Sequence, residues 1–317
     1  MRAIAVHDQK LVLEAAPDPI LREGDLLIDV RAAGVNRADL LQRLGRYPAP
    51  PGESAIIGLE VAGVVVEPPE RRGERVMALL AGGGYAERVR VPAGQAMPIP
   101  DGLTFAQAAA IPEAFLTAYL NLFTLGALSE GQALVVHAAA SGVGTAALQL
   151  ARGTAQVILA TASRDKLESC RAFGATHLLA RDEVPQGLAA AVQAAAGRGA
   201  DLVLDLVGGA YLEANVQALG LHGRLCCIST MAGSRATLDL GLLLRNRLTV
   251  LGSTLRTRSA AQKAKLVADF TREALPRFGK DLAPVVARTF PLAQAQQAHE
   301  ALESNQVVGK LVLEVDA

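Results

Sequence analysis

Residues 133–150 read ALVVHAAASGVGTAALQL, and this stretch decides the fold. Its apolar start predicts a buried strand, its small residues a tight turn, and the rest a helix from Thr145 to Arg152. Dinucleotide binding requires this arrangement, because small residues let the backbone approach a pyrophosphate and a helix N-terminus offers free N–H groups. Against the fingerprint G-x-G-x-x-G, the glycine positions hold Ala139, Ser141 and Gly144. The alternative is a small-residue turn that holds no ligand.

From about Pro112 onward, short apolar runs alternate with stretches of helical pattern. Alternation of this kind predicts βαβ units and a parallel sheet, and continuous apolar runs fit strands that are covered on both faces. We therefore predict an α/β protein with a doubly wound, Rossmann-type sheet over residues 115–255. The predicted strands are 133–137, 157–160, 202–206, 225–228 and 248–251, and the helices are 145–152, 166–173, 188–196 and 211–219.

The two ends of the chain follow a different pattern. Residues 1–114 predict strands at 26–30, 57–66 and 73–80, with a turn at 82–84, in a mostly antiparallel β unit. Residues 256–317 predict a helix at 260–275, a strand at 285–290, a helix at 292–303 and a last strand at 310–315. We expect this C-terminal part to return to the first domain.

Composition excludes several classes of protein. The 317 residues correspond to about two domains, and 51% hydrophobic with 20% charged residues excludes disorder and a disulfide scaffold. Lys plus Arg equals Asp plus Glu at 31 each, aromatic residues are 3% and Trp is absent, which argues against nucleic-acid binding. The N-terminus has too few apolar residues for a signal peptide. The uncharged stretch 131–151 fits a strand, turn and helix better than a membrane span.

Three cysteines, Cys170, Cys226 and Cys227, give an odd number without metal-ligand spacing. We expect reduced, mostly buried thiols and a cytoplasmic location.

The second predicted strand runs into ATASRDK at residues 160–166. An NAD site places an acid about 20 residues past the fingerprint, whereas this turn offers Ser163, Arg164 and Lys166. A hydroxyl and two cations suit a 2′-phosphate, which favours NADP(H). The alternative is that Ser163 only caps a helix and both cations face solvent. Arg181 is either a further phosphate contact or a surface charge.

Six stretches resemble a known family: NRADLLQR at 36–43, YPAPPG at 47–52, GLE at 58–60, AAAIPEA at 108–114, SGVGTAA at 141–147 and VGKLVLE at 308–314. Over nearly its whole length the chain is similar to the zinc-independent quinone oxidoreductases of the medium-chain dehydrogenase/reductase superfamily, most of all to their tumour-suppressor-inducible branch. The resemblance implies a GroES-like catalytic domain, a Rossmann domain, NADPH as cofactor and a homodimer or larger assembly.

The same resemblance bears on metal binding. Zinc-dependent relatives carry a Cys where this chain has Asn36, a His where it has Leu59, and four clustered Cys, whereas here no Cys precedes Cys170. Asp39 and Glu60 remain, fewer than the three protein ligands of a catalytic zinc, so we predict no metal.

Without a Lewis acid the acceptor must already be electrophilic, as a quinone or a conjugated carbonyl is. We predict NADPH-dependent reduction of quinones by hydride transfer. The alternatives are a 2-enoyl or 2-alkenal reductase, and an NADPH-binding structural or RNA-binding protein.

Candidate site residues follow from these expectations. Tyr47 is the candidate donor to the developing oxygen, or else a loop aromatic packed under the Pro-rich segment. Asn36 hydrogen-bonds the nicotinamide ribose or the substrate, or caps a helix at 37–44. The family suggests that Ser141 also matters for activity.

The remaining expected cofactor contacts come from the fold, because the carboxyl ends of parallel strands line the binding crevice. Thr117 and Glu113 are expected at the domain junction, Lys310 is expected to close the site, and 248–251 is expected to be an edge strand that pairs across a dimer. The full predicted cofactor set is Asn36, Thr117, Ala139, Ser141, Gly142, Val143, Gly144, Ala162, Ser163, Lys166, Arg181, Val207, Gly208, Ser229, Thr230, Met231 and Lys310.

Overall fold

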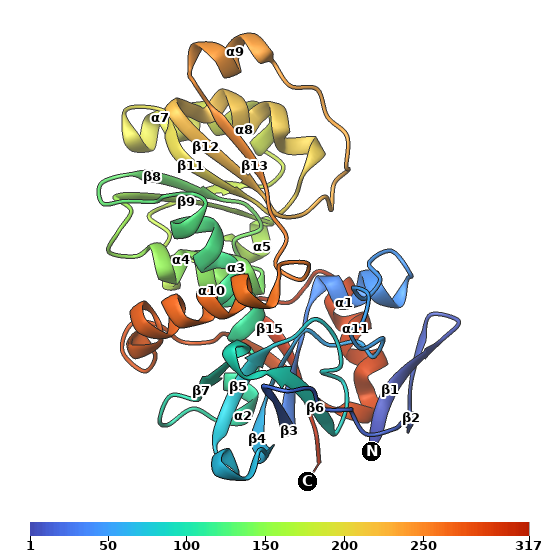
Figure 1. Cartoon of the computed structure of the whole chain (residues 1–317). Helices are drawn as coiled ribbons and strands as arrows, with labels where there is room; N and C mark the ends of the chain where they lie inside the picture. The colour runs from blue at the N-terminus through green and yellow to red at the C-terminus, as the bar shows by residue number, and fades with distance from the viewer. Residues whose placement is uncertain (317) are drawn as a thin grey trace. The chain divides into compact units, whose positions relative to one another are not determined.

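The computed structural model describes residues 1–316, which fall into two compact units (Figure 1). One unit comprises Met1–Leu116 together with the C-terminal stretch from Leu255, and the other comprises Thr117–Thr254. The predicted boundaries at 114 and 255 lie close to these. The first boundary falls inside helix α3 (Pro112–Tyr119), which is continuous across it.

The second unit is built on a six-stranded parallel sheet with the strand order β10-β9-β8-β11-β12-β13. This is the order 3-2-1-4-5-6 of the doubly wound dinucleotide-binding fold, so the predicted α/β class is confirmed. The strands are β8 (Ala133–Val136), β9 (Val157–Ala162), β10 (His177–Ala180), β11 (Ala200–Asp205), β12 (Leu219–Cys227) and β13 (Thr249–Gly252).

Helices cover both faces of this sheet, with α7 and α8 on one side and α4 on the other (Figure 1). Val135, Leu159 and Val203 point to the α7 side, where they pack with Leu188 and Val192. The helical segments are α4 (Gly142–Ala151), α5 (Arg164–Leu167), α6 (Ser169–Ala172), α7 (Val184–Ala196), α8 (Leu212–Ala218) and α9 (Leu240–Arg245), with the shorter turns η3 (Leu120–Thr124) and η4 (Gly209–Tyr211).

Three details differ from the prediction. Helix α4 begins at Gly142 rather than Thr145, because Ser141 caps it and its glycines occupy the first turn. The helix predicted at 166–173 is two short helices, α5 and α6. Strand β10 was not among the predicted strands, since only three of its four residues are apolar. The uncharged stretch 131–151 is β8, a turn and α4, and no helix within residues 1–316 is long and apolar enough to cross a membrane.

The first unit contains a β hairpin and a seven-stranded sheet with the order β14-β15-β3-β4-β5-β7, in which β6 also pairs with β3. All pairs are antiparallel except β14 with β15. The hairpin is β1 (Arg2–His7) and β2 (Lys10–Ala15), and the sheet strands are β3 (Asp25–Val35), β4 (Glu60–Glu67), β5 (Arg75–Leu79), β6 (Arg88–Pro92), β7 (Ala96–Pro98), β14 (Val286–Pro291) and β15 (Lys310–Glu314).

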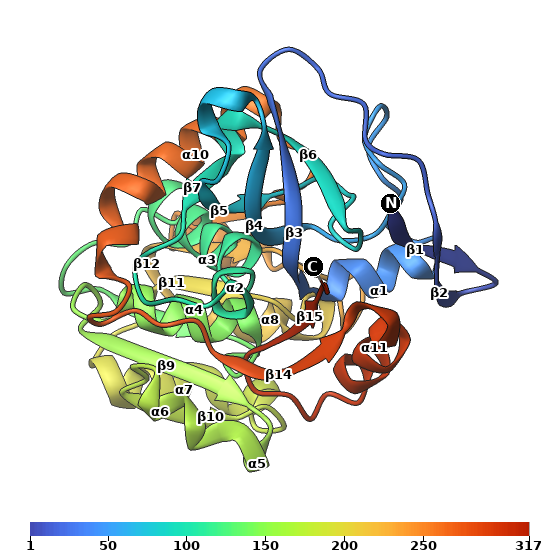
Figure 2. The same cartoon turned by 90° about the horizontal axis from the view of Figure 1, so that it is seen from below.

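The C-terminal strand β15 carries the end of the chain back to its beginning. Leu311 of β15 lies opposite Val35 of β3, so Lys310 comes next to Asn36. Helix α11 packs beside β14 and β15 (Figure 2). The helical segments of this unit are α1 (Arg37–Arg43), α2 (Phe105–Ala108), α10 (Ala260–Glu273) and α11 (Ala295–Glu303), with the short turns η1 (Pro69–Arg71), η2 (Ala93–Gln95), η5 (Leu275–Arg277) and η6 (Leu292–Gln294).

Candidate functional site

The turn between β8 and α4 ends in a capped helix N-terminus. Ser141 Oγ accepts a hydrogen bond from the Gly144 N–H at 3.1 Å, which satisfies one of the first-turn donors. The N–H groups of Gly142 and Val143 have no partner within the helix, because the first turn of an α-helix lacks preceding carbonyls. The turn therefore presents backbone donors at the positive end of a helix, which is an anion-binding arrangement.

Gly144 lets this helix approach the sheet. A Cβ added there would lie 2.5 Å from the carbonyl oxygen of Ala138 and 2.6 Å from Cα of Ala139, so no other residue fits without movement of the backbone. Ala139 is in turn held by its N–H, which donates to the Thr161 carbonyl at 2.9 Å. This is the role of the third glycine in a dinucleotide fingerprint, namely close packing of helix on strand.

The turn after β9 contains a buried hydroxyl without a hydrogen-bond partner among residues 1–316. Ser163 Oγ does not cap α5, and although Ser163 lowers the pKa of the nearby Asp165 carboxyl, no hydrogen bond of normal geometry joins the two. Lys166 follows in the same short helix and is partly buried. The Arg181 N–H donates to the Ala162 carbonyl at 2.8 Å, which brings the ends of β9 and β10 together. Three of the predicted phosphate ligands are thus gathered in one place.

Arg164, which the sequence also suggested as a phosphate ligand, has other partners. Its guanidinium lies 3.0 Å from Asp182 and 2.7 Å from Glu183, and all three side chains are exposed. An exposed ion pair of this kind contributes little stability, about 0–1 kcal/mol. The pair nevertheless directs Arg164 toward β10 and its following acids.

The loops after β11 and β12 pack against each other. Asp205 Oδ1 accepts hydrogen bonds from Val207 N at 2.7 Å and Gly208 N at 3.0 Å, which fixes a sharp turn. Gly208 has φ +90°, and a Cβ there would lie 2.7 Å from Thr230 Cα and 2.8 Å from the Ser229 carbonyl oxygen. Four of the predicted cofactor residues, Val207, Gly208, Ser229 and Thr230, are therefore neighbours at the carboxyl edge of the sheet. Met231 follows them and is 53% exposed.

Thr117, another predicted cofactor residue, has a contact within its own helix. It lies in α3, and its carbonyl accepts a hydrogen bond from Asn121 Nδ2 at 2.8 Å. A contact between Thr117 and a cofactor stays a prediction.

In the first unit, a buried ion pair joins β4 to β15. Lys310 Nζ lies 2.6 Å from Glu60 Oε1, and their side chains are 6% and 0% exposed. The ammonium also donates to the Val35 carbonyl at 2.9 Å and to Asn36 Oδ1. Glu60 further accepts hydrogen bonds from Asn36 Nδ2 and from the Glu113 N–H, each at 2.9 Å. An ammonium has three N–H donors, and these contacts account for all three. A contact between Lys310 and a cofactor stays a prediction.

Asn36 occupies the N-cap position of α1, but its side chain serves the ion pair. Its amide bridges Glu60 and Lys310, while its backbone N–H donates to Asp39 Oδ2 at 2.7 Å. Gly34 leaves space for this arrangement, because a Cβ there would collide with the Glu60 carboxylate. The sequence suggested two roles for Asn36, as a ligand of ribose or substrate and as a side-chain cap. Neither of them included this bridge between Glu60 and Lys310.

The donor set around Glu60 does not fit zinc. Its carboxylate is neutralised by an ammonium, the neighbouring Asn36 amide is hydrogen-bonded on both sides, and Leu59 offers no donor atom. Within residues 1–316, no group of three or more His, Cys, Asp or Glu side chains is placed to hold a metal ion.

The three cysteines are free, as expected. Burial raises the pKa of each thiol, Cys170, Cys226 and Cys227, to about 11, so at neutral pH they are protonated and weak as nucleophiles or metal ligands.

A second buried polar group links α1 to α11. The Tyr85 hydroxyl lies 3.2 Å from Asp39 Oδ2 and 3.1 Å from His299 Nε2, and all three side chains are inaccessible to solvent. Burial raises the pKa of Asp39 to about 7, and the Glu60 charge works in the same direction. Burial lowers the pKa of His299 to about 3. Burial thus shifts both side chains toward their neutral forms, fully for His299 at neutral pH and in part for Asp39.

Tyr47 packs against Arg256. The guanidinium carbon lies 5.0 Å from the ring centroid, and Arg256 also donates to the carbonyls of Tyr47 at 2.9 Å and Ala81 at 2.8 Å. The Tyr47 hydroxyl makes no hydrogen bond with residues 1–316. Burial raises the Tyr47 pKa, and Glu113 adds to this. Burial and the Glu60 charge raise the pKa of Glu113 itself to about 8. The ring thus packs on Arg256 rather than demonstrably under the Pro-rich segment, and the hydroxyl remains a protonated donor.

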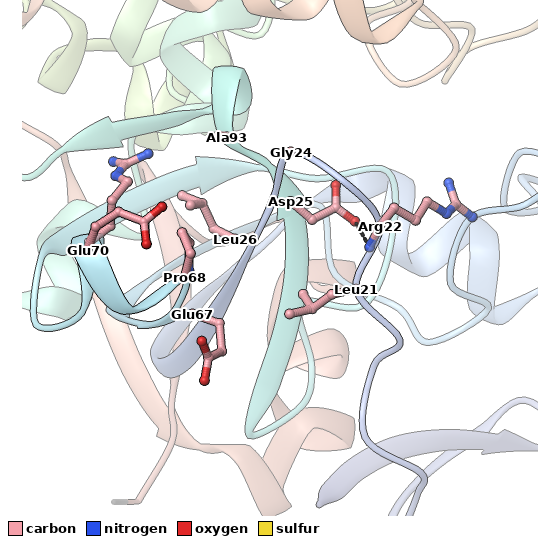
Figure 3. A pocket seen from close by; sticks show the side chains of 10 residues that line it. Leu21, Arg22, Gly24, Asp25, Leu26, Glu67, Pro68, Glu70 and Ala93 are labelled. Carbon is pink, nitrogen blue, oxygen red and sulfur yellow. Dashed lines mark hydrogen bonds between the residues drawn. The ribbon is translucent and has the colours of Figure 1, made fainter.

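A surface cavity of about 480 Å³ lies elsewhere in the first unit (Figure 3). Leu21, Arg22 and Asp25 line one wall, and Glu67 and Pro68 line the other. None of the predicted site residues lines it, and we assign it no role in the predicted chemistry.

Two family models match the chain: the alcohol dehydrogenase GroES-like domain at residues 22–101 and the zinc-binding dehydrogenase model at residues 142–271. A solved quinone oxidoreductase from Thermus thermophilus, described alone and in complex with NADPH, is 38% identical with a TM-score of 0.83. The alignment covers 99% of this chain and 100% of that one. The chain belongs to the medium-chain dehydrogenase/reductase superfamily. Its first unit is the GroES-like domain of that superfamily.

Other members of the superfamily are similar as well. Mycobacterial Rv1454c, solved in complex with NADPH, is 28% identical with a TM-score of 0.85 and covers 99% of both chains. The synaptic vesicle membrane protein VAT-1 homolog of Mus musculus is 39% identical over 206 residues, which is 63% of this chain. The match spans about half the length of that curated relative.

Sequence reasoning missed the partners of several residues that it named. Glu60 was considered only as a metal ligand, and Arg256 and His299 were not considered. The Glu60–Lys310 pair joins residues from opposite ends of the chain, so no local pattern announces it. For another buried group the sequence did hold a chemical signal. His137 ends an apolar run, and a buried imidazole needs hydrogen-bond partners.

Proposed function

We propose that the protein reduces quinones by hydride transfer from NADPH without a metal ion. The observation that carries the cofactor assignment is the pair of turns at the carboxyl edge of the parallel sheet, one with free backbone donors and one with an unpaired buried hydroxyl. The full-length similarity to a quinone oxidoreductase described with NADPH supports the same assignment. Likeness to the tumour-suppressor-inducible branch stays a prediction.

The residues present fit NADPH. The first turn of α4, from Ser141 to Gly144, would hold the pyrophosphate through the N–H groups of Gly142 and Val143. Ser163 and Lys166 would hold the 2′-phosphate, one as a hydroxyl donor and one as a cation, with Arg181 near them. When bound, NADPH supplies the hydride. The protein's own contribution is then to bind, orient and complete the proton transfer.

The acceptor class follows from the absence of a Lewis acid in the proposed mechanism. The Lys310 ammonium neutralises Glu60, and Asn36 and Leu59 stand where zinc-dependent relatives carry Cys and His, so a plain ketone would have no metal ion to polarise it. A quinone needs no such help, because its carbonyls accept hydride readily and the product is an aromatic diol. A conjugated carbonyl satisfies the same requirement and is the alternative acceptor.

Tyr47 is the proposed donor to the reduced acceptor. Its hydroxyl has no hydrogen-bond partner among residues 1–316, and its raised pKa keeps the proton on the oxygen. Arg256 fixes the ring through the stacked guanidinium. A hydrogen bond from Tyr47 would stabilise the negative charge that develops on the acceptor oxygen after hydride arrives.

We further propose that the protein is a homodimer. Strand β13 is the edge strand of its sheet, and near it Leu240 and Leu244 are 62% and 74% exposed. An uncovered edge with apolar neighbours favours pairing with a second copy. Analytical ultracentrifugation tests this, and a monomer at micromolar concentration would contradict it.

The acceptor assignment is tested with a panel of substrates. NADPH oxidation is followed with ortho-quinones, para-quinones, 2-enoyl thioesters and 2-alkenals at equal concentrations. The proposal predicts the highest kcat/KM with a quinone. Turnover with enoyl substrates alone would keep the cofactor and replace the acceptor class. NADPH binding without turnover of any acceptor would favour a structural or RNA-binding role.

A further inference from the structure

A buried imidazole joins the strands of the parallel sheet behind the proposed cofactor site. His137 follows β8 and is inaccessible to solvent. Its Nδ1 lies 2.8 Å from the Thr161 hydroxyl of β9, and its Nε2 lies 2.6 Å from Asn215 Oδ1 of α8. Asn215 Nδ2 donates to Asp205 Oδ2 at 3.1 Å, at the end of β11. Tyr211 closes the group with its ring edge-on to the imidazole at 4.9 Å.

Donors and acceptors can be assigned along this series of hydrogen bonds. A carboxylate only accepts, so Asn215 must present its NH₂ to Asp205 and its carbonyl oxygen to His137. His137 therefore donates from Nε2. Burial lowers the His137 pKa, which favours the neutral imidazole, and in that form Nδ1 accepts from the Thr161 hydroxyl.

The series of hydrogen bonds that starts at His137 ends on the turn that follows β11. Asp205 Oδ2 is held by Asn215, and its Oδ1 accepts from the N–H groups of Val207 and Gly208. Gly208 in turn packs on Thr230. At the other end, Thr161 accepts through its carbonyl from Ala139 of the phosphate turn. One imidazole thus connects the turn that follows β8 with strand β9 and, through Asn215 and Asp205, with the turn that follows β11. The turns after β8 and β11 are predicted to hold the cofactor.

We propose that His137 is a positioning residue for the dinucleotide: acting through Asn215 and Asp205, it sets the Val207–Gly208 turn relative to the phosphate turn. This inference rests on the proposed function, because it takes NADPH as the ligand of these loops. It adds a residue that touches none of the cofactor and whose effect must pass through two others.

The test exploits the fixed hydrogen-bond directions. Asn215→Asp places a second carboxylate against Asp205. The hydrogen bond between residues 215 and 205 then cannot form without an extra proton. Adding Asp205→Asn restores it in full, because the new amide accepts from the two N–H groups and donates to the new carboxylate, which still accepts from His137. Gln217→Glu, the same amide-to-acid change on an exposed residue of α8, is the matched control. The readout is the NADPH dissociation constant from nucleotide fluorescence, with circular dichroism to verify folding.

We expect Asn215→Asp to raise the dissociation constant about tenfold or more, and the double variant and the control to bind like the wild type. Asn215→Ser replaces Asn215→Asp if the latter does not fold, with weakened binding again expected. Wild-type affinity in the single variant, or no recovery in the double variant, overturns the inference. A ¹⁵N spectrum that places the His137 proton on Nδ1 also overturns it. If the wild type binds no NADPH, the proposed function itself fails and the positioning role with it.

Discussion

Lys310 Nζ and Glu60 Oε1 lie 2.6 Å apart in the interior of the first unit, although they come from opposite ends of the chain. The pair exists because β15 lies antiparallel to β3, which brings Lys310 beside Asn36 and the start of β4. The Lys310 ammonium neutralises Glu60, one of the two carboxylates that the sequence left as candidate metal ligands. The Lys310 charge also works to lower the pKa of two further buried carboxyls, Asp39 and Glu113.

Lys310→Met is expected to destabilise the protein by about 3–5 kcal/mol, because it leaves the Glu60 carboxylate buried without its cation. Chemical denaturation measures this loss. The double variant Lys310→Met with Glu60→Gln removes both charges and should lose less than the single variant. An unfolding free energy of Lys310→Met within about 1 kcal/mol of the wild-type value would be close to the effect of an ordinary surface substitution. That result would show that the pair does not stabilise the fold as expected.

Gly144→Ala is expected to abolish tight dinucleotide binding and to lower the melting temperature, because the new Cβ would lie 2.5 Å from the Ala138 carbonyl oxygen. Gly187→Ala in α7 is the control, since a Cβ there has no neighbour closer than 3.9 Å. That change should stabilise the protein by about 0.5–1 kcal/mol, the usual gain of Ala over Gly inside a helix. Thermal melts and NADPH titration of both variants are sufficient. Equal behaviour of the two variants would refute the close-packing role.

The sequence predicted the elements that follow from local pattern. The strand, turn and helix at 133–150, the alternation that follows, and the parallel sheet are all present. Strand β10 was not predicted, because it is four residues long and begins with an exposed His. Helix α4 was placed late because glycine lowers helix propensity, whereas a capped first turn tolerates it.

Side-chain partners were harder to predict than elements, because they depend on tertiary contacts. Asn36 was correctly placed before a helix, yet its amide binds Glu60 and Lys310. No pattern in residues 36–43 encodes a partner in the last strand. The unpaired state of the Ser163 hydroxyl was equally invisible, since a Ser before a short helix normally caps it.

Ser163→Ala and Lys166→Ala are expected to raise KM for NADPH by about tenfold or more while changing KM for NADH little, since charge-assisted phosphate contacts contribute at least about 1.5 kcal/mol. Arg164→Ala is the comparison, because Arg164 is paired with Asp182 and Glu183 and should affect both cofactors weakly. Steady-state kinetics with the two cofactors decide the matter. Equal losses for NADPH and NADH would point to general packing of the turn.

Tyr47→Phe is expected to lower kcat by about 10²-fold, in the range for a lost proton donor or transition-state hydrogen bond, and to leave NADPH affinity unchanged. The ring and its contact with Arg256 are retained in Phe, so folding should be preserved. Turnover and NADPH titration are measured on the same preparation. An unchanged kcat would remove Tyr47 from the mechanism.

Asp39→Asn is expected to change how stability depends on pH. The folded pKa of Asp39 is raised to about 7 from an unfolded value of about 3.9, so the native state holds the extra proton and stability falls as pH rises through this window. His299, with its pKa lowered to about 3, acts oppositely, because its stabilisation is lost as pH falls below about 6.5. The variant keeps only the second effect.

The unfolding free energy at pH 8 minus that at pH 5 should therefore be more positive in Asp39→Asn than in the wild type. Urea denaturation at the two pH values gives this difference, and Asp29→Asn on the surface is the control. Parallel pH profiles for wild type and Asp39→Asn would contradict the raised pKa.

The central claim is hydride transfer from NADPH to a quinone with no metal. The most direct measurement is the initial rate of NADPH oxidation with a para-quinone by chelator-treated protein, with the zinc content determined on the same sample. The account predicts an undiminished rate at a zinc content far below one atom per chain, and no increase when zinc is added. A rate that disappears with the metal and returns with added zinc would contradict it.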